Sequence, residues 1–203
     1  MKTYRDHYFK KAKAEGYPAR SVYKLQEIDR RFKLLSSGRR VLDLGAAPGS
    51  WSLYAGERVA PAGLVLAVDI AEWAPGTAGA GAPRVRFLRA DVLEGSPALD
   101  AALAEVGPFD VVLSDMAPKT TGVRFADQAH SLELAMRALS LAERWLRPGG
   151  NFVVKVFMGP DVAELERAMR VVFETVRNYK PKGSRAESFE IFALGLGRLG
   201  GTE

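Results

Sequence analysis

The residues best placed to do chemistry in this sequence are four aspartates and one lysine, each near the end of an apolar, β-prone run. They are Asp43, Asp69, Asp91, Asp115 and Lys155. If these runs are parallel strands, their carboxyl ends meet at the edge of the sheet where ligands bind. Lys155 is the unusual member, because a lysine is rarely placed in a buried-type strand such as Phe152 to Phe157. The ordinary alternative is a lysine that reaches solvent at a strand edge.

The stretch from Val41 to Trp51 predicts a strand, a glycine turn and a helix that begins near Ser50. Gly45 and Gly49 leave room for a ligand to approach the backbone, where a Cβ would clash. A strand followed by a glycine turn and a helix N-terminus is typical of a nucleotide-type site. Asp69 ends the next strand, where an acid can accept hydrogen bonds from both ribose hydroxyls of an adenosine.

The spacing of the glycines indicates which nucleoside the turn would bind. Dinucleotide folds use G-x-G-x-x-G, whereas this run is Gly45-Ala-Ala-Pro-Gly49 and lacks the middle glycine. The carboxylate of Asp43 would also repel a phosphate. S-adenosyl-L-methionine carries an adenosine and a sulfonium cation but no phosphate, so it suits these residues better. The alternative is an ordinary strand–turn–helix corner that binds no ligand.

Alternating apolar runs and helical patterns predict an α/β fold, a Rossmann-like, mostly parallel, seven-stranded sheet with helices on both faces. The expected strands are residues 41–44, 64–69, 84–90, 109–114, 151–157, 174–179 and 188–195. The expected helices are residues 21–34, 51–59, 97–106, 127–146 and 161–173. The basic loop from Lys180 to Arg185 is too short for a crossover helix, so the last strand should pair antiparallel. Residues 1–15 should be partly ordered only with a partner, and residues 71–83 read as a loop.

Composition excludes several classes of protein. The 203 residues suffice for one α/β domain with a full core, and 47 % of them are hydrophobic. No cysteine is present, which excludes disulfides, thiol nucleophiles and cysteine-based zinc sites, and with only two histidines we expect no metal. No apolar run reaches the roughly 18 residues of a membrane helix, and no signal peptide is recognisable. We expect a cytoplasmic protein without a membrane partner, and a monomer.

Basic charge is concentrated at the start of the chain. Residues 1–40 contain twelve lysines and arginines and four acids, a net charge of +8, whereas the remaining 17 basic and 20 acidic residues give −3. Such asymmetry is typical of a polyanion partner, most often nucleic acid. A solvated basic helix without a partner is the alternative. We expect residues 1–40 to be an RNA-contacting extension of the same domain, residues 41–198 the catalytic part and residues 199–203 a tail.

Several motifs spread over most of the chain resemble the FtsJ/RrmJ family of S-adenosylmethionine-dependent ribose 2′-O-methyltransferases. They are Ser-Val-Tyr-Lys24-Leu, Asp43-Leu-Gly-Ala-Ala-Pro-Gly-Ser-Trp51, Asp69, Asp91, Ser-Asp115-Met-Ala-Pro, Phe-Val-Val-Lys155-Val-Phe and Ser-Arg-Ala-Glu-Ser-Phe-Glu190. The resemblance implies a catalytic tetrad of Lys24, Asp115, Lys155 and Glu190. It implies cofactor contacts at Gly49, Trp51, Asp69, Asp91 and Asp115. It also implies large-subunit ribosomal RNA as the partner, with a uridine ribose as the substrate.

The resemblance assigns roles that chemistry can support. A ribose hydroxyl is a poor nucleophile and must lose its proton, and Lys155 is our candidate general base. Burial and the nearby Lys24 would both favour a neutral amine, whereas Asp115 would oppose it and more readily orients Lys155 and the methyl donor. Glu190 would position Lys24 or the ribose. Two departures from the family are Ser50, where a second glycine is common, and the divergent loop of residues 119–129, which bears on the choice of RNA target.

Other functions remain open at this point. A ribose methyltransferase acting on transfer RNA would use the same residues. A small-molecule O-methyltransferase would not need the basic N-terminal segment. An RNA-binding ribosome-assembly factor with a decayed cofactor pocket would not need all four tetrad residue types. A nicotinamide dehydrogenase is disfavoured because the G-x-G-x-x-G pattern is missing.

Overall fold

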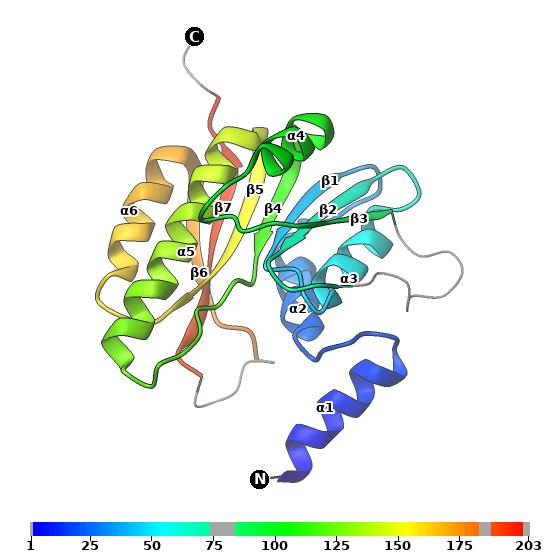
Figure 1. Ribbon diagram of the computed structural model, residues 1–203, viewed down its shortest axis with the longest axis vertical. Coiled ribbons are helices and arrows are strands. Elements are labelled where there is room, and N and C mark those ends of the chain that lie inside the picture. Colours follow the sequence, from blue (N-terminus) through cyan, green and yellow to red (C-terminus); the bar gives the residue numbers. More distant parts are fainter. Residues whose placement is uncertain (1, 74–83, 183–187, 201–203) are drawn as a thin grey trace.

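The structure is a computed structural model that describes residues 2–73, 84–182 and 188–200, with side chains described from residue 8 onward (Figure 1). Seven strands in these ranges form one sheet in the order β3-β2-β1-β4-β5-β7-β6. The strands are β1 (Arg40–Leu44), β2 (Leu64–Asp69), β3 (Val85–Arg89), β4 (Phe109–Ser114), β5 (Leu146–Phe157), β6 (Phe173–Tyr179) and β7 (Glu190–Arg198). Strands β1 to β5 pair in parallel, and β7 runs antiparallel to both β5 and β6. The predicted sheet and its antiparallel last strand are confirmed.

Helices cover both faces of the sheet (Figure 1). They are α1 (Lys2–Ala14), α2 (Val22–Phe32), α3 (Ser50–Val59), α4 (Pro97–Val106), α5 (Arg124–Trp145) and α6 (Val162–Val172). Buried residues of α4, α5 and α6 share one core with the sheet, and buried residues of α2 and α3 share the core on the opposite face. Because α2 carries Leu25 and Ile28 into that core, it is an integral layer of the fold.

The central strands are buried on both faces, which explains why they read as continuous apolar runs. Every residue of β4 is buried, and so are the last four of β1. Parallel strands covered by helices on both sides have no solvent face, so apolar residues do not alternate with polar ones.

The strand order creates a crevice at the carboxyl ends of β1 and β4. The chain moves from β1 outward through β2 to β3, and then returns to β4 on the other side of β1. Ligands of open α/β sheets bind outside the strand ends at such a reversal. The residues that follow β1 and β4, Gly45 and Asp115, are therefore neighbours at this crevice.

Some expected boundaries are wrong. Helix α5 begins at Arg124 rather than at Asp127, because the carboxylate of Asp127 accepts hydrogen bonds from the preceding turn and so lies inside the first helical turn. Strand β5 begins five residues earlier and β7 ends three residues later than expected. The β sheet extends wherever a neighbouring strand supplies hydrogen bonds, which local sequence does not reveal.

The N-terminal segment is also more ordered than expected. Residues 2–14 form α1, and Ala12 near its end is buried in a small core with Tyr17, Val22 and Leu53. Packing against α3 therefore orders this segment without a partner. Part of the expected loop at 71–83 (residues 74–83) and part of the basic loop (residues 183–187) lie outside the described residues. None of the described helices is both long and apolar enough to cross a membrane.

Candidate active site

A cavity of about 500 Å³ opens at the carboxyl edge of the sheet. Strand ends supply three of its acids, Asp69, Asp91 and Asp115. The loop after β4 adds Met116 to Lys119, and one face of α5 adds His130, Glu133 and Leu134. Three of the five residues predicted at strand ends therefore line one cavity. A fourth, Asp43, is buried close to Asp69 and Asp115. The α5 residues escaped the sequence analysis, although their spacing of three and four places them on one helical face.

The glycine turn is shaped by close contacts that exclude side chains. Gly45 has φ of +75° and Gly49 has φ of +103°, a region that favours glycine. A Cβ on Gly45 would lie 2.7 Å from Met116 Cγ, and one on Gly49 would lie 2.2 Å from the ring of Trp73. These glycines thus allow the protein's own side chains to pack closely, and the predicted approach of a ligand to the turn stays a prediction.

The two outer acids are fixed by backbone N–H groups. Asp69 Oδ2 accepts from Ala47 N at 2.9 Å, and its Oδ1 accepts from Ala71 N at 2.7 Å. Asp91 Oδ1 accepts from Leu93 N at 2.8 Å. Asp69 thereby fastens the glycine turn to the end of β2. Both carboxylates border the cavity, and their negative charge favours a cationic ligand over a phosphate.

Asp43 is fully buried beneath the turn. Its Oδ2 accepts a hydrogen bond from Ser52 Oγ at 2.5 Å, and Oδ1 has no hydrogen-bond partner among the described residues. The pKa of Asp43 is raised to about 7, mainly by burial; the Ser52 hydrogen bond lowers it, and the carboxylates of Asp115 and Asp69 contribute to the rise. An unpaired buried carboxyl oxygen close to two other acids fits a site built for a positively charged ligand.

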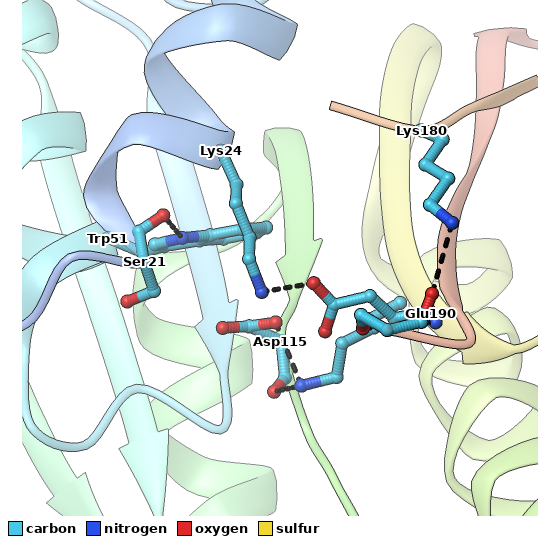
Figure 2. A network of polar contacts seen from close by, with 8 residues as sticks. Ser21, Lys24, Trp51, Asp115, Lys180 and Glu190 are labelled. Carbon is cyan, nitrogen blue, oxygen red and sulfur yellow. Dashed lines mark hydrogen bonds and ion pairs between the residues drawn. The ribbon is translucent and has the colours of Figure 1, made fainter. Parts of the chain in front are cut away.

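Trp51 and Gly49 are not among the residues that line the cavity. The indole of Trp51 is buried, donates from Nε1 to Ser21 O at 2.9 Å, and packs on Phe192 with ring centroids 5.6 Å apart (Figure 2). These contacts tie α3 to the start of α2 and to β7. The expected cofactor contact of Trp51 stays a prediction. Its side chain holds α2 and β7 in place, the elements that carry Lys24 and Glu190.

The four residues of the expected tetrad come together from four separate parts of the chain. Lys24 on α2 forms an ion pair with Glu190 at the start of β7, and Figure 2 shows these two side chains pointing toward each other above Asp115. Lys155 Nζ on β5 lies 2.9 Å from Asp115 Oδ1 and donates to Asp115 O at 2.6 Å. Lys155 is 8 % exposed, so the alternative of a solvent-reaching lysine is wrong. Asp115 belongs to both the tetrad and the cavity.

Sheet register explains why Lys155 and Glu190 share a side. Glu190 pairs with Phe157 across the antiparallel β5–β7 ladder, and Phe157 lies two residues beyond Lys155. Residues i and i+2 of a strand point to the same face, and directly paired residues do too. Lys155 and Glu190 are therefore diagonal neighbours on the face covered by α2, from which Lys24 reaches down.

Further contacts hold the tetrad in place. Ser50 Oγ accepts from Ala19 N at 2.7 Å and donates to Ala19 O at 3.1 Å, so the serine at the family's usual glycine position anchors the segment before α2. Lys180 Nζ donates to Ser188 O at 3.0 Å, two residues before Glu190. Neither residue was singled out as functional, since each acts through a distant backbone group.

The arrangement fits S-adenosyl-L-methionine on structural grounds. The cavity has acids but its described lining contains no glycine-rich phosphate cradle, and the buried Asp43 lies below it. Asp115 lines the cavity, and Lys155 contacts Asp115 from β5. Among the described residues, no cluster of three or more histidine, aspartate or glutamate side chains is placed to hold a metal ion.

Comparison with known proteins agrees with this reading. Residues 17–198 match the FtsJ-like methyltransferase family. The chain is 60 % identical over 200 residues to a protein of Nitratidesulfovibrio vulgaris (strain DSM 19637 / Miyazaki F) named Ribosomal RNA large subunit methyltransferase E, with 98 % of each chain covered. A protein of the same name from Sorangium cellulosum is 53 % identical, with 95 % of this chain and 88 % of that protein covered.

A solved structure supports the same placement. A crystal structure from Plasmodium falciparum, described as that of a ribosomal RNA methyltransferase, superposes with a TM-score of 0.76 at 26 % identity, covering 91 % of this chain and all of that one. The S-adenosylmethionine-dependent O-methyltransferase from Thermotoga maritima has a TM-score of 0.58 at 13 % identity, which shows a shared fold. From the matched length and the identity to its relatives, this chain belongs to the FtsJ-like methyltransferase family.

Proposed function

We propose that this protein transfers a methyl group from S-adenosyl-L-methionine to the 2′-hydroxyl of a ribose in large-subunit ribosomal RNA. The observation that carries the proposal is the junction of the acid-lined cavity with the Lys24–Asp115–Lys155–Glu190 cluster at the shared residue Asp115. The relatives named Ribosomal RNA large subunit methyltransferase E support the substrate class. A uridine as the target, a monomeric state and a cytoplasmic location are part of the same proposal.

The cofactor would be held by the turn at Gly45 to Gly49 and by the carboxylates of Asp69 and Asp91. It supplies an electrophilic methyl group on a sulfonium. Asp115, at the border of the cavity, would lie between the donor and Lys155. The contact expected of Trp51 belongs to this proposal as well, through the start of α3.

Lys155 would accept the proton of the ribose hydroxyl. An amine nitrogen has four tetrahedral positions, of which one leads to its own carbon. One of the others donates to Asp115 O at 2.6 Å, and Asp115 Oδ1 lies 2.9 Å from the same nitrogen. In the neutral amine, a lone pair on this nitrogen would be available to a substrate hydroxyl. Asp115 thus orients the base, and no group needs to move for the proton to transfer.

The Lys24–Glu190 pair would position the ribose. Both side chains are largely buried, at 14 % and 13 % exposure, so the pair is screened less than a surface ion pair. The Lys24 ammonium can donate to a ribose oxygen while Glu190 limits its movement. We expect Lys24→Met and Glu190→Gln each to lower methyl transfer, and the double variant to be little worse than the more damaging single one, because residues that act as a unit are non-additive. Independent, additive losses in single-turnover rates would contradict this pairing.

The decisive experiment measures transfer of labelled methyl groups to undermethylated large ribosomal subunits, to protein-free ribosomal RNA and to bulk transfer RNA. The proteins compared are wild type, Lys155→Met, Lys155→Arg and the control Arg167→Met, which removes an exposed cation on α6, outside residues 1–40. Wild type should give alkali-resistant 2′-O-methyl linkages in the large-subunit RNA.

A base role predicts that both Lys155 variants lose about 10²- to 10⁴-fold in rate while still binding S-adenosyl-L-methionine, because arginine keeps the charge but does not give up its proton. The control should stay near wild type. If only transfer RNA were labelled, the proposed substrate would be transfer RNA and not ribosomal RNA. Transfer to neither RNA, with the cofactor bound, would overturn the proposal and point to a small-molecule acceptor or a non-catalytic RNA-binding role. If Lys155→Arg were active, Lys155 would act as a positive charge and not as a general base.

A further inference from the structure

Arg124 and Phe189 form a cation–aromatic pair beside Glu190, and the proposed chemistry does not use this pair. The Arg124 guanidinium, at the start of α5, lies 4.3 Å from the centroid of the Phe189 ring. Phe189 directly precedes Glu190 of the proposed tetrad and is 56 % exposed. Phe125, next to Arg124, is exposed to 72 %. We call Arg124, Phe125 and Phe189 the Arg124 ledge.

Backbone hydrogen bonds already hold both sides of the ledge. Asp127 accepts from Thr121 N at 2.7 Å, from Thr121 Oγ1 at 2.9 Å and from Gly122 N at 3.2 Å, which closes the loop before Arg124. These hydrogen bonds lower the pKa of Asp127, so the loop keeps its charged cap at neutral pH. On the other side, Met158 N donates to Phe189 O at 2.6 Å. The Arg124–Phe189 contact is therefore not needed to fasten these segments.

Further exposed apolar side chains flank the residues of this ledge. Val123 and Met158, next to its two sides, are exposed to 61 % and 42 %. Large exposed aromatic side chains are unfavourable in water unless something covers them, and a cluster of them usually marks a binding surface. The Arg124 cation favours a negatively charged partner, and the Phe189 ring favours one with a planar face. Because the ledge lies beside the tetrad, we take this partner to be part of the substrate.

We propose that the Arg124 ledge stacks an unpaired nucleobase of the RNA next to the ribose that the tetrad methylates. Sequence-specific recognition of RNA commonly uses splayed bases stacked on aromatic rings or on arginine planes, and the arginine charge also attracts the phosphate backbone. A base held there would fix the register of the RNA strand and so set which ribose reaches Lys155. The inference rests on the proposed function, because it requires an RNA ribose at the tetrad.

The test uses aromatic and planar substitutions in the full-length protein. We would measure the affinity for unmodified, protein-free large-subunit ribosomal RNA at a salt concentration that weakens phosphate contacts, together with S-adenosyl-L-methionine binding and thermal unfolding. The variants are Phe189→Leu, Phe189→Tyr, Phe125→Leu, Arg124→Gln and Arg124→Lys. The matched control is Arg144→Gln, because Arg144 lies 5.1 Å over the Trp145 ring at the opposite end of the same helix.

Stacking predicts that Phe189→Leu and Arg124→Gln weaken RNA binding about 5- to 150-fold, that Phe125→Leu also weakens it, and that Phe189→Tyr stays close to wild type. Arg124→Lys should also weaken binding, because lysine keeps the charge but has no planar face. Cofactor binding and the unfolding temperature should change little, and Arg144→Gln should bind RNA as wild type does.

Wild-type affinity in the leucine and glutamine variants, with methyl transfer intact, would overturn the ledge alone. Unchanged RNA affinity with a slower rate would also overturn it, since the pair would then only position Glu190. If the variants bound assembled subunits more weakly but bound protein-free RNA normally, the ledge would contact a ribosomal protein and not a nucleobase. A wild-type protein that methylates no RNA would overturn the proposed function and the ledge together.

Discussion

Asp43 shows most clearly how one residue links the fold to the site. It is a carboxyl group with no exposure and one hydrogen bond, from Ser52, in the middle of the cofactor motif. Burying an ionised carboxyl without a full set of partners is costly, so the protein favours its protonated form. The pKa of Asp43 therefore rises to about 7, from 3.8 without the protein around it.

This shift predicts how stability depends on pH. Because the folded-state pKa of Asp43 is raised, its contribution is fully present below pH 4 and is lost as pH rises through about 7. Asp43→Asn cannot titrate, so the free energy of unfolding of wild type relative to this variant should fall by up to about 4 kcal/mol between pH 4 and pH 8. Urea unfolding at several pH values measures the difference.

Comparing the two proteins cancels the groups that they share. The lowered pKa of Asp127, held down mainly by the hydrogen bond from Thr121 N, stabilises both proteins at neutral pH and is lost on acidification in both. A wild-type-minus-variant difference that does not change with pH would show that Asp43 is charged throughout.

Among the elements, the turn between β1 and α3 determines how closely the cavity loops can pack. Gly49 begins α3 with φ of +103° and lies under the Trp73 ring, while Gly149 near the start of β5 has φ of +76° and open space around it. The two glycines therefore share an unusual backbone conformation but differ in their surroundings.

Alanine at these two positions separates backbone strain from a steric clash. Gly149→Ala should cost about 1 kcal/mol in the free energy of unfolding, from the positive φ alone. Gly49→Ala should cost about 1–3 kcal/mol more, because its Cβ must displace Trp73, and it should also weaken S-adenosyl-L-methionine binding. Denaturant unfolding and calorimetric titration give the two values. Equal losses in both variants would mean that the Trp73 ring moves away freely.

At the scale of the whole molecule, charge is separated along the chain. The +8 of residues 1–40 is balanced by a slightly acidic remainder, for a net charge of +5. Figure 1 shows α1 projecting from the body below α2, at the bottom of the view. Under the proposed function, a basic helix so placed would contact phosphates beyond the nucleotide that is methylated.

Salt dependence tests this contact. Replacing Lys10, Lys11 and Lys13 of α1 by glutamine should weaken RNA binding and reduce the slope of log affinity against log salt by about 2–3, since each phosphate contact contributes about 0.7–0.9. The control replaces Arg167, Arg170 and Arg177 of α6 and β6 by glutamine. If both sets change the slope equally, the RNA responds to net charge and not to α1.

Much of the fold followed from local pattern. Strand β2, strand β4 and helix α4 have the predicted bounds, because apolar runs, an N-cap at Ser96 and the Pro97 that follows it are local signals. Local pattern did not predict where β5 begins or that residues 2–14 form the ordered helix α1. Strand pairing and the burial of Ala12 depend on residues distant in the chain.

The sequence by itself determined the fold class and the acids at the strand ends, because these depend on periodicity and turn chemistry, and its motifs indicated the residues of the proposed tetrad through a family resemblance. Only the tertiary structure decided which side chains meet. The antiparallel β7, inserted between β5 and β6, brings Glu190 to Lys24 and Phe189 to Arg124, and buries Trp51 against Phe192. Contacts between residues so far apart in the chain arise from sheet order and register, which no local stretch encodes.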